Sequence, residues 1–429
     1  MVTASAATAG TLLAHGCSSS SVTTASNPTP AVNINPADAP EVTGARLGFI
    51  ALTDSAPLII AKEKGYFQKY GMADMEVTRQ SSWGEVRDNL VLGSGQGGID
   101  GGDILSSMPY LISTGTITDG NKIPLYILAR LNVNGQGISL ANIYKQMDVR
   151  LDSAKLKQAV EEAKAAGPGR QLKIAVTFAG GTHDLWMRYW LAAGGINPDT
   201  DVSMFVVPPP QMVANMKTGT MHALCVGEPW NAQLIRENIG HSALITGEMW
   251  QNHPGKAFTM RSDWVDKYPK ATRALLMAVQ ETQIWCDDIA NKQEMCEIIS
   301  ARKFLKVPTK DIVERAKGNF DFGNGRVSEN SPHRMKFWSD SASYPYKSHD
   351  VWFLTENIRW GYLPTDTDIR ALVDAVNRED LWQEAAKAIG QTAAIPQSSS
   401  RGVETFFNGI TFDPENPTAY LQSLKIKKV

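Results

Sequence analysis

Short apolar runs alternate with amphipathic segments along the first part of the chain. The run at residues 46–52 has the composition of a buried strand, and a helical pattern with a proline in its first turn follows over 57–64. A second β-rich run at 75–79 completes a β–α–β unit, which implies a parallel sheet because the crossover returns the chain in the same direction. Further helices are expected at 83–92 and 108–113, with another strand at 123–131.

A second set of strands and helices begins at residue 172 and continues until about residue 260. From residue 262 onward the pattern is mainly helical. Two such blocks indicate two α/β lobes, with the chain crossing between them near 131–140 and returning near 227–245. The expected elements of the second block are strands at 172–178, 202–207, 221–226, 243–246 and 257–260, with helices after Gly181 and at 211–217.

The junction between the first strand and helix of the second block has the features of an anion site. The strand ends at Gly180-Gly181 and a helix with an apolar face opens at once. The first amides of a helix have no intrahelical partner, and the helix dipole favours negative charge there. Thr182 or Asp184 can cap this helix, and His183 can donate one ring N–H. We therefore expect a cleft built around this point.

Composition and charge exclude several classes of protein. The chain of 429 residues is long enough for two or three domains, and 43% hydrophobic with 20% charged residues is typical of a globular protein. A net charge of −2 gives no global attraction for nucleic acid or an anionic membrane, so any anion specificity must be local. No apolar run has the length of a transmembrane helix.

The cysteines and histidines do not predict a metal or cofactor site. Cys17, Cys225, Cys286 and Cys296 form no CxxC motif, and no two histidines have the i, i+4 spacing of a helical metal site. A Cys286–Cys296 bridge is not expected, because ten residues of one continuous helix would hold the two thiols too far apart.

The N-terminal segment predicts secretion and lipid attachment. Residues 2–16 are small and apolar, and residues 13–17 resemble a bacterial lipobox in which Cys17 is lipidated. No basic residue precedes this run, as in a truncated signal segment. Residues 17–44, rich in Ser, Thr, Asn, Pro and Ala, are expected to form a flexible tether. The alternative is a disordered tail without lipid.

Several further residues have two interpretations each. Trp83 can pack in a core or line a pocket, and Lys256 can be a solvated surface lysine. Gln136 is expected in a glycine loop just after a strand, where ligands collect in α/β folds. Glu228, near the return crossing, can be a hinge residue or a helix cap. Residues 93–98 fit G-x-G-x-x-G, but a helix precedes them and a strand follows, which excludes a dinucleotide fingerprint.

Taken together, specific motifs resemble the nitrate-binding lipoproteins of cyanobacterial ABC uptake systems, whose closest relatives bind bicarbonate. The resemblance extends from about residue 47 to residue 429. It implies a type II periplasmic-binding-protein fold, with the ligand cleft between lobe I (45–130 and 240–429, with a C-terminal strap) and lobe II (131–239). The motifs include Gly180-Gly-Thr-His-Asp184 and the segments 54–60, 65–71, 82–89, 97–101, 135–138, 208–212, 227–231 and 343–347.

The resemblance also implies a function without catalysis. The protein is expected to capture nitrate, and also nitrite, on the periplasmic side of the plasma membrane, and to deliver it to a permease whose ATPase is a separate chain. No cofactor is implied. At matching positions the nitrate-binding residues would be Trp83, Gln136, His183 and Lys256, with Thr182 and Glu228 as weaker ligand or hinge candidates.

The hydrogen-bonding chemistry of nitrate and bicarbonate also favours a nitrate-binding function. Nitrate only accepts hydrogen bonds, so its pocket requires donors, whereas bicarbonate also donates one and favours an acceptor or a bound cation. An acid in place of Lys256 would repel nitrate. The alternatives are a bicarbonate receptor and an enzyme on the same fold. The enzyme would need a reactive cysteine or a cofactor lysine, whereas Cys225 lies in an apolar strand and is expected to be inert. A sensor domain fused to a regulatory module is disfavoured, because no such module is present.

Overall fold

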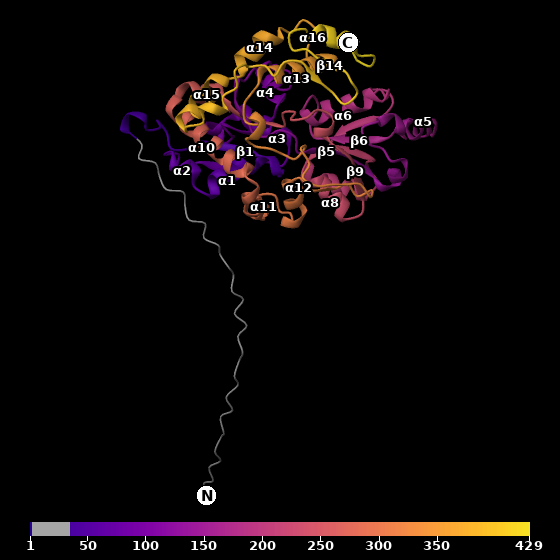
Figure 1. Ribbon diagram of the computed structural model, residues 1–429, viewed down its shortest axis with the longest axis horizontal. Coiled ribbons are helices and arrows are strands. Elements are labelled where there is room, and N and C mark those ends of the chain that lie inside the picture. The colour runs from indigo at the N-terminus through magenta and orange to yellow at the C-terminus, as the bar shows by residue number, and fades with distance from the viewer. Residues whose placement is uncertain (2–34) are drawn as a thin grey trace.

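The computed structural model describes Met1 and residues 35–429. The expected signal segment, the Cys17 lipidation site and most of the expected tether therefore lie outside the described residues. The described chain forms two α/β lobes side by side, with the C-terminal segment lying across them (Figure 1). The two-lobed α/β architecture expected from the sequence is confirmed.

Lobe I is built on a five-stranded sheet with the order β2-β1-β3-β10-β4. β1 runs parallel to β2 and β3, as its β–α–β pattern predicted, whereas β10 runs antiparallel to β3 and β4. Its strands are β1 (Arg46–Phe49), β2 (Glu76–Arg79), β3 (Gly101–Leu105), β4 (Leu125–Arg130) and β10 (Lys256–Arg261). Its helices are α1 (Ala56–Glu63), α2 (Tyr66–Lys69), α3 (Trp83–Leu92), α4 (Met108–Ser113), α9 (Ser262–Lys267) and α10 (Pro269–Asp287).

Lobe II contains the second five-stranded sheet, with the order β7-β6-β8-β5-β9. β6 is parallel to β7 and β8, and β5 is antiparallel to β8 and β9. Its strands are β5 (Gln136–Ala141), β6 (Lys173–Val176), β7 (Ser203–Val206), β8 (Ala223–Gly227) and β9 (Gly240–Ile245). Its helices are α5 (Lys157–Ala165), α6 (Thr182–Ala193), α7 (Pro209–Lys217) and α8 (Trp230–Arg236).

Two boundaries differ from the sequence-based expectation. Gln136 does not lie in a loop but is the first residue of β5, which hydrogen-bonds to β8 and β9. The expectation placed residue 240 at the start of the return into lobe I, whereas β9 belongs to the lobe II sheet and the chain returns only after Ile245. An apolar run alone does not show which sheet a strand joins, because the pairing depends on distant residues.

The C-terminal segment contacts both lobes. α13 (Lys347–Arg359) packs on α6 of lobe II, and α15 (Glu379–Ala388) packs on α10 and β4 of lobe I. The C-terminal tail, which was expected to form a strap over the surface, contains a short helix, α16 (Pro417–Ser423), which packs on α13. The remaining elements are α11 (Lys292–Ser300), α12 (Val313–Lys317), α14 (Ile369–Val376), β11 (Phe320–Asp321), β12 (Val327–Ser328), β13 (Glu404–Thr405) and β14 (Thr411–Phe412).

The helical region that holds Cys286 and Cys296 is not continuous. α10 ends at Asp287 and Asp288 adopts an extended conformation before α11 begins. The assumption of one helix was therefore wrong, although both residues are buried free thiols in the structure. Among the described helices, none is both long and apolar enough to cross a membrane.

An aromatic cluster joins the C-terminal segment to lobe II. The Trp352 ring on α13 stacks on Trp186 of α6 with centroids 4.7 Å apart, and Trp250 lies 5.3 Å from the Trp352 ring. All three side chains are buried, so the cluster holds α13 against α6 by apolar burial and ring contacts.

Truncating Trp352 should therefore destabilise the protein. Trp352→Ala is expected to lower the free energy of unfolding by about 3–5 kcal/mol, because it leaves a cavity among large rings. Chemical denaturation followed by circular dichroism measures this change. The control Ile143→Ala removes an exposed side chain and should change stability by less than about 0.5 kcal/mol. Equal stability of the two variants would contradict a structural role for the cluster.

Candidate functional site

The loop between β6 and α6 presents a helix start to lobe I. Gly180 has a left-handed φ of 72°, and a Cβ on Gly181 would lie 2.7 Å from Leu105 Cδ1 at the end of β3. A side chain at either position is therefore disfavoured, by backbone conformation at Gly180 and by the close approach of lobe I at Gly181. The Ser107 hydroxyl of lobe I also donates to the Gly180 carbonyl at 2.8 Å, so the loop is fixed between the lobes.

The expected side-chain cap of α6 is absent. The N-cap residue is Gly181, and neither Thr182 nor Asp184 caps the helix with its side chain. The Asp184 carboxylate instead accepts from the Gly180 amide at 2.9 Å and from the Tyr362 hydroxyl at 2.7 Å. The Thr182 hydroxyl is buried and has no hydrogen-bonding partner among the described residues.

The structure brings the four principal candidates to the boundary between the lobes. Trp83 opens α3, Gln136 opens β5, His183 lies in the first turn of α6, and Lys256 opens β10; all four are buried. The Lys256 ammonium lies 5.8 Å from the centroid of the Trp83 ring. Leu105, the residue opposite Lys256 in the β3–β10 pairing, would lie 2.7 Å from a Cβ on Gly181, two residues before His183. The interpretation of Lys256 as a solvated surface residue is therefore wrong.

Gln136 reaches the same region through its strand partner. The residue opposite Gln136 in the β5–β8 pairing is Gly227. A Cβ on Gly227 would lie 3.3 Å from an oxygen of Asp54, and that same oxygen is 2.5 Å from Lys256 Nζ. Gln136, on lobe II, is therefore paired with a residue that lies next to the Asp54–Lys256 ion pair of lobe I.

These side chains share an unusual property, because several of their polar atoms are buried without a hydrogen bond. More than nine-tenths of buried polar groups in folded proteins have a partner, so a cluster of unpaired atoms marks a place where a polar ligand fits. The unpaired atoms in this cluster are Trp83 Nε1, Gln136 Oε1 and Nε2, Thr182 Oγ1 and His183 Nε2.

His183 is held in a form that can donate one hydrogen bond. Burial, followed by the charge of Lys256, holds its pKa well below the usual range, so the imidazole is neutral at pH 7. The Thr177 hydroxyl lies 2.7 Å from Nδ1. When Thr177 donates to Nδ1, the single ring proton is on Nε2, the nitrogen that has no protein partner.

The sequence led us to expect a site made of hydrogen-bond donors alone, but two carboxyl groups also lie in it. Asp54 accepts from Lys256 Nζ at 2.5 Å. Asp103 lies on β3 two residues before Leu105, the partner of Lys256 in the β3–β10 pairing, so the Asp103 and Lys256 side chains are on the same face of the sheet. Burial, followed by the Asp54 carboxylate, raises the pKa of Asp103 well above the usual range. An acidic residue within the buried strand β3 was the only sequence signal for this arrangement.

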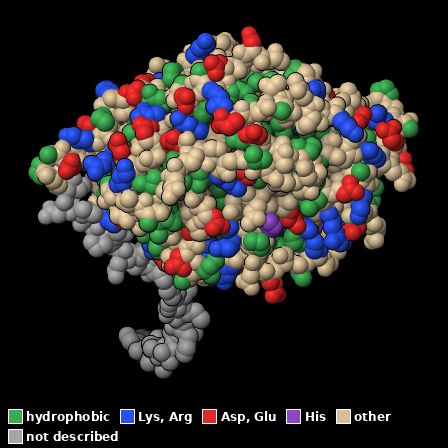
Figure 2. All heavy atoms as spheres, turned by 45° about the horizontal axis from the view of Figure 1, so that its top comes forward, with side chains coloured by type: hydrophobic (Ala, Val, Ile, Leu, Met, Phe, Trp, Pro, Cys, Tyr) green, Lys and Arg blue, Asp and Glu red, His purple; other side chains and the backbone are tan. Residues whose placement is uncertain are grey.

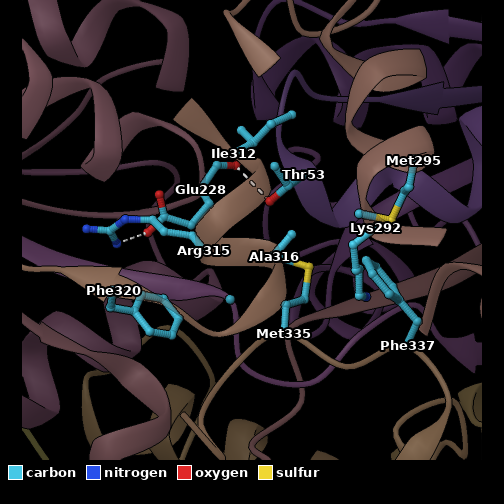
Figure 3. A pocket seen from close by; sticks show the side chains of 11 residues that line it. Thr53, Glu228, Lys292, Met295, Ile312, Arg315, Ala316, Phe320, Met335 and Phe337 are labelled. Atoms are coloured by element: carbon cyan, nitrogen blue, oxygen red, sulfur yellow. Dashed lines mark hydrogen bonds and ion pairs between the residues drawn. The ribbon is translucent and has the colours of Figure 1, made fainter. Parts of the chain in front are cut away.

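Glu228 lies at the junction of the lobes and not among the unpaired donors. Its carboxylate forms an ion pair with Arg315 at 2.6 Å, and its backbone carbonyl accepts from the Thr53 amide of lobe I at 2.8 Å. It borders a separate, mainly apolar cavity (Figure 3). The cavity is lined by Thr53, Gly135, Glu228, Lys292, Met295, Ile312, Arg315, Ala316, Phe320, Met335 and Phe337.

Both basic residues that line the cavity in Figure 3 already bind groups of the protein. Arg315 is paired with Glu228, and Lys292 donates to the Cys286 carbonyl at 2.6 Å. On the face shown in Figure 2, basic and acidic side chains are interspersed, so the surface there has no large field of one sign. The cluster around Lys256 is the stronger candidate for anion binding, because its neighbours Trp83, Gln136 and His183 have unpaired buried nitrogen atoms.

The described residues provide neither a reactive thiol at Cys225 nor a cluster of metal-binding side chains. Cys225 is fully buried in β8, and burial raises the pKa of its thiol, which makes the nucleophilic thiolate scarce. Within residues 35–429, no group of three or more histidine, cysteine, aspartate or glutamate side chains is arranged to hold a metal ion.

Comparison with known proteins gives a consistent result. Residues 38–300 match the NMT1-like family. The chain is 61% identical to the nitrate/nitrite binding protein NrtA of Nostoc sp. (strain PCC 7120), over 100% of this chain and 98% of that protein. It is 45% identical to the bicarbonate-binding protein CmpA of Synechococcus elongatus, over 90% of this chain and 88% of that protein.

A solved structure agrees with these relatives. The fold superposes on the crystal structure of the periplasmic nitrate-binding protein NrtA from Synechocystis PCC 6803 with a TM-score of 0.88 and 62% identity, covering 90% of this chain and 100% of that one. The chain therefore belongs to the NMT1-like family and is a solute-binding protein of the nitrate/nitrite-binding group rather than an enzyme.

Proposed function

We propose that this protein captures nitrate, and also nitrite, between its two lobes and delivers it to the permease of an ABC importer. The observation that carries the proposal is the cluster of unpaired buried donors around Lys256. Trp83 and Lys256 come from lobe I, and Gln136, Thr182 and His183 come from lobe II. A ligand held by both sets would stabilise the closed arrangement of the lobes.

The unpaired N–H groups of the cluster favour nitrate, whereas the unpaired oxygens of Asp54 and Asp103 would suit the O–H of bicarbonate. Lys256 supplies the positive charge, and Trp83 Nε1, His183 Nε2 and the Gln136 amide supply neutral N–H donors. Nitrate offers acceptor atoms only, so each of these groups can be used. Identity to the nitrate/nitrite binding protein is 61%, compared with 45% to the bicarbonate-binding one, which supports the same choice.

The proposed setting is the periplasmic side of the plasma membrane. The apolar segment at 2–16 followed by Cys17 supports secretion and a lipid anchor at that cysteine. The proline- and serine-rich residues up to about 44 would tether the two lobes to the membrane. The permease and the ATPase would be separate chains.

Calorimetric titration tests the ligand. Nitrate and nitrite are expected to bind at one site per chain, and bicarbonate is expected to bind more weakly, because all of the oxygens of nitrate can accept from the unpaired N–H groups whereas one oxygen of bicarbonate carries a proton. Heat with bicarbonate and none with nitrate would overturn the proposal in favour of a bicarbonate receptor.

Replacing Lys256 tests the source of charge. Lys256→Glu should abolish nitrate binding, since it places a third acid beside Asp54 and Asp103. Lys256→Met removes the ammonium, and with it the partner of Asp54, and should cost about 2–5 kcal/mol of binding free energy. The control Lys217→Glu alters an exposed lysine and should bind as the unaltered protein does. Circular dichroism establishes that each variant is folded, and unchanged affinity in Lys256→Met would remove Lys256 from the site.

Replacing Trp83 tests a single donor. Trp83→Phe keeps most of the ring but deletes Nε1, so nitrate affinity should fall by about 1–3 kcal/mol if that N–H contacts the anion. Trp285→Phe, on α10, is a matched control away from the cluster and should leave affinity unchanged. Titration of both variants distinguishes a ligand contact from simple core packing, for which both affinities would stay the same.

A further inference from the structure

Two carboxyl groups and one ammonium are enclosed together at the candidate site. Asp54, Asp103 and Lys256 have no solvent-exposed surface. One oxygen of Asp54 is 2.5 Å from Lys256 Nζ. The other Asp54 oxygen and both Asp103 oxygens have no hydrogen-bonding partner within the described chain. We refer to Asp54 and Asp103 as the carboxyl pair.

The charges of this cluster balance only if the carboxyl pair holds a proton. Two ionised carboxylates beside one ammonium would leave a net buried charge of −1, and an uncompensated buried charge costs several kcal/mol. The raised pKa of Asp103 agrees with one proton held by the pair. Asp54 is then the counter-ion of Lys256.

An arriving nitrate disturbs this balance, because it adds a negative charge next to the same ammonium. If Asp54 stays ionised, the enclosed site again has a net charge of −1 and the anion faces a carboxylate. If Asp54 takes up a proton, the site is neutral and the acceptor becomes an O–H donor, which suits a ligand that only accepts hydrogen bonds.

We propose that the carboxyl pair Asp54–Asp103 takes up a proton when nitrate binds, so that the anion replaces Asp54 as the counter-ion of Lys256. This inference rests on the proposed function. In charge and atoms the step is simple: one nitrate and one proton enter from solvent, and no covalent bond forms except the O–H bond on the pair.

The other titratable groups around the site are poorly suited to accept this proton. Burial lowers the pKa of His183 well below its usual range and that of His253 to about 3, and it raises the pKa of Cys225, so all three stay neutral near pH 7. Asp184 is paired with Arg188 at 3.0 Å. The carboxyl pair is therefore the group whose charge the anion changes.

Proton uptake can be measured directly on the full chain. Nitrate is titrated calorimetrically at one pH in buffers with different ionisation enthalpies, and the slope of heat against that enthalpy gives the protons taken up. We expect a value approaching one proton per nitrate. Because nitrate itself does not titrate, Kd should rise with pH, by up to about tenfold per pH unit, within the pH range over which the protein stays folded.

The outcomes separate the two proposals. Nitrate binding with buffer-independent heats and a constant Kd across this pH range would overturn proton uptake and leave nitrate capture standing. No nitrate binding in any buffer would overturn the proposed function, and with it this inference.

A variant locates the proton. The double variant Asp54→Asn, Asp103→Asn has no carboxyl left in the pair and keeps N–H donors, so it should bind nitrate with no proton uptake and a Kd that is independent of pH. Asp350→Asn is the matched control, because Asp350 is equally buried and also paired with a cation, Arg130, but does not contact Lys256. It should retain the uptake of the unaltered protein. Undiminished uptake in a folded double variant would overturn the assignment, and the measurement on the unaltered chain remains decisive if that variant does not fold.

Discussion

Lys256 carries its charge at a position with no access to solvent, on the first residue of a strand that returns from lobe II to lobe I. An ammonium at such a place requires compensation, and the structure provides it through Asp54, which comes from the loop after β1. The contact spans 202 positions in sequence, so it can form only when β1, β3 and β10 lie together in one sheet. The fold of lobe I therefore determines which charges meet at the site.

The lobe boundary is closed around this charge by a small set of specific contacts. Thr53 donates its amide to the Glu228 carbonyl at 2.8 Å, and Trp230 Nε1 donates to the Ala51 carbonyl at 3.1 Å. On the other side, Ser107 donates to Gly180 next to the start of α6. These bonds join loops that also carry Asp54 and His183, so the relative position of the lobes and the geometry of the donors change together. This coupling is the physical basis on which a small anion can favour the closed arrangement.

The C-terminal segment adds a second connection between the lobes. Its aromatic residues pack on α6, while α15 packs on α10 and β4 of lobe I. Tyr362 donates to Asp184, which in turn accepts from the Gly180 amide, so the segment reaches the loop at the candidate site. The segment thus orients the helix start that carries His183, although it contributes none of the donors.

The sequence by itself determined the α/β class, the two blocks, most of the strands and helices, and the candidate residues that its motifs marked. The reason is that periodicity, glycine stops and proline starts act over a few neighbouring residues, as at Gly180-Gly181 and in the helix at Trp83–Leu92. Only the tertiary structure decided that Gln136 begins a strand, that β9 joins the second sheet, and that Asp54 and Asp103 stand beside Lys256. Those features depend on strand pairing and charge contacts between residues far apart in the chain, and local sequence patterns do not predict such contacts.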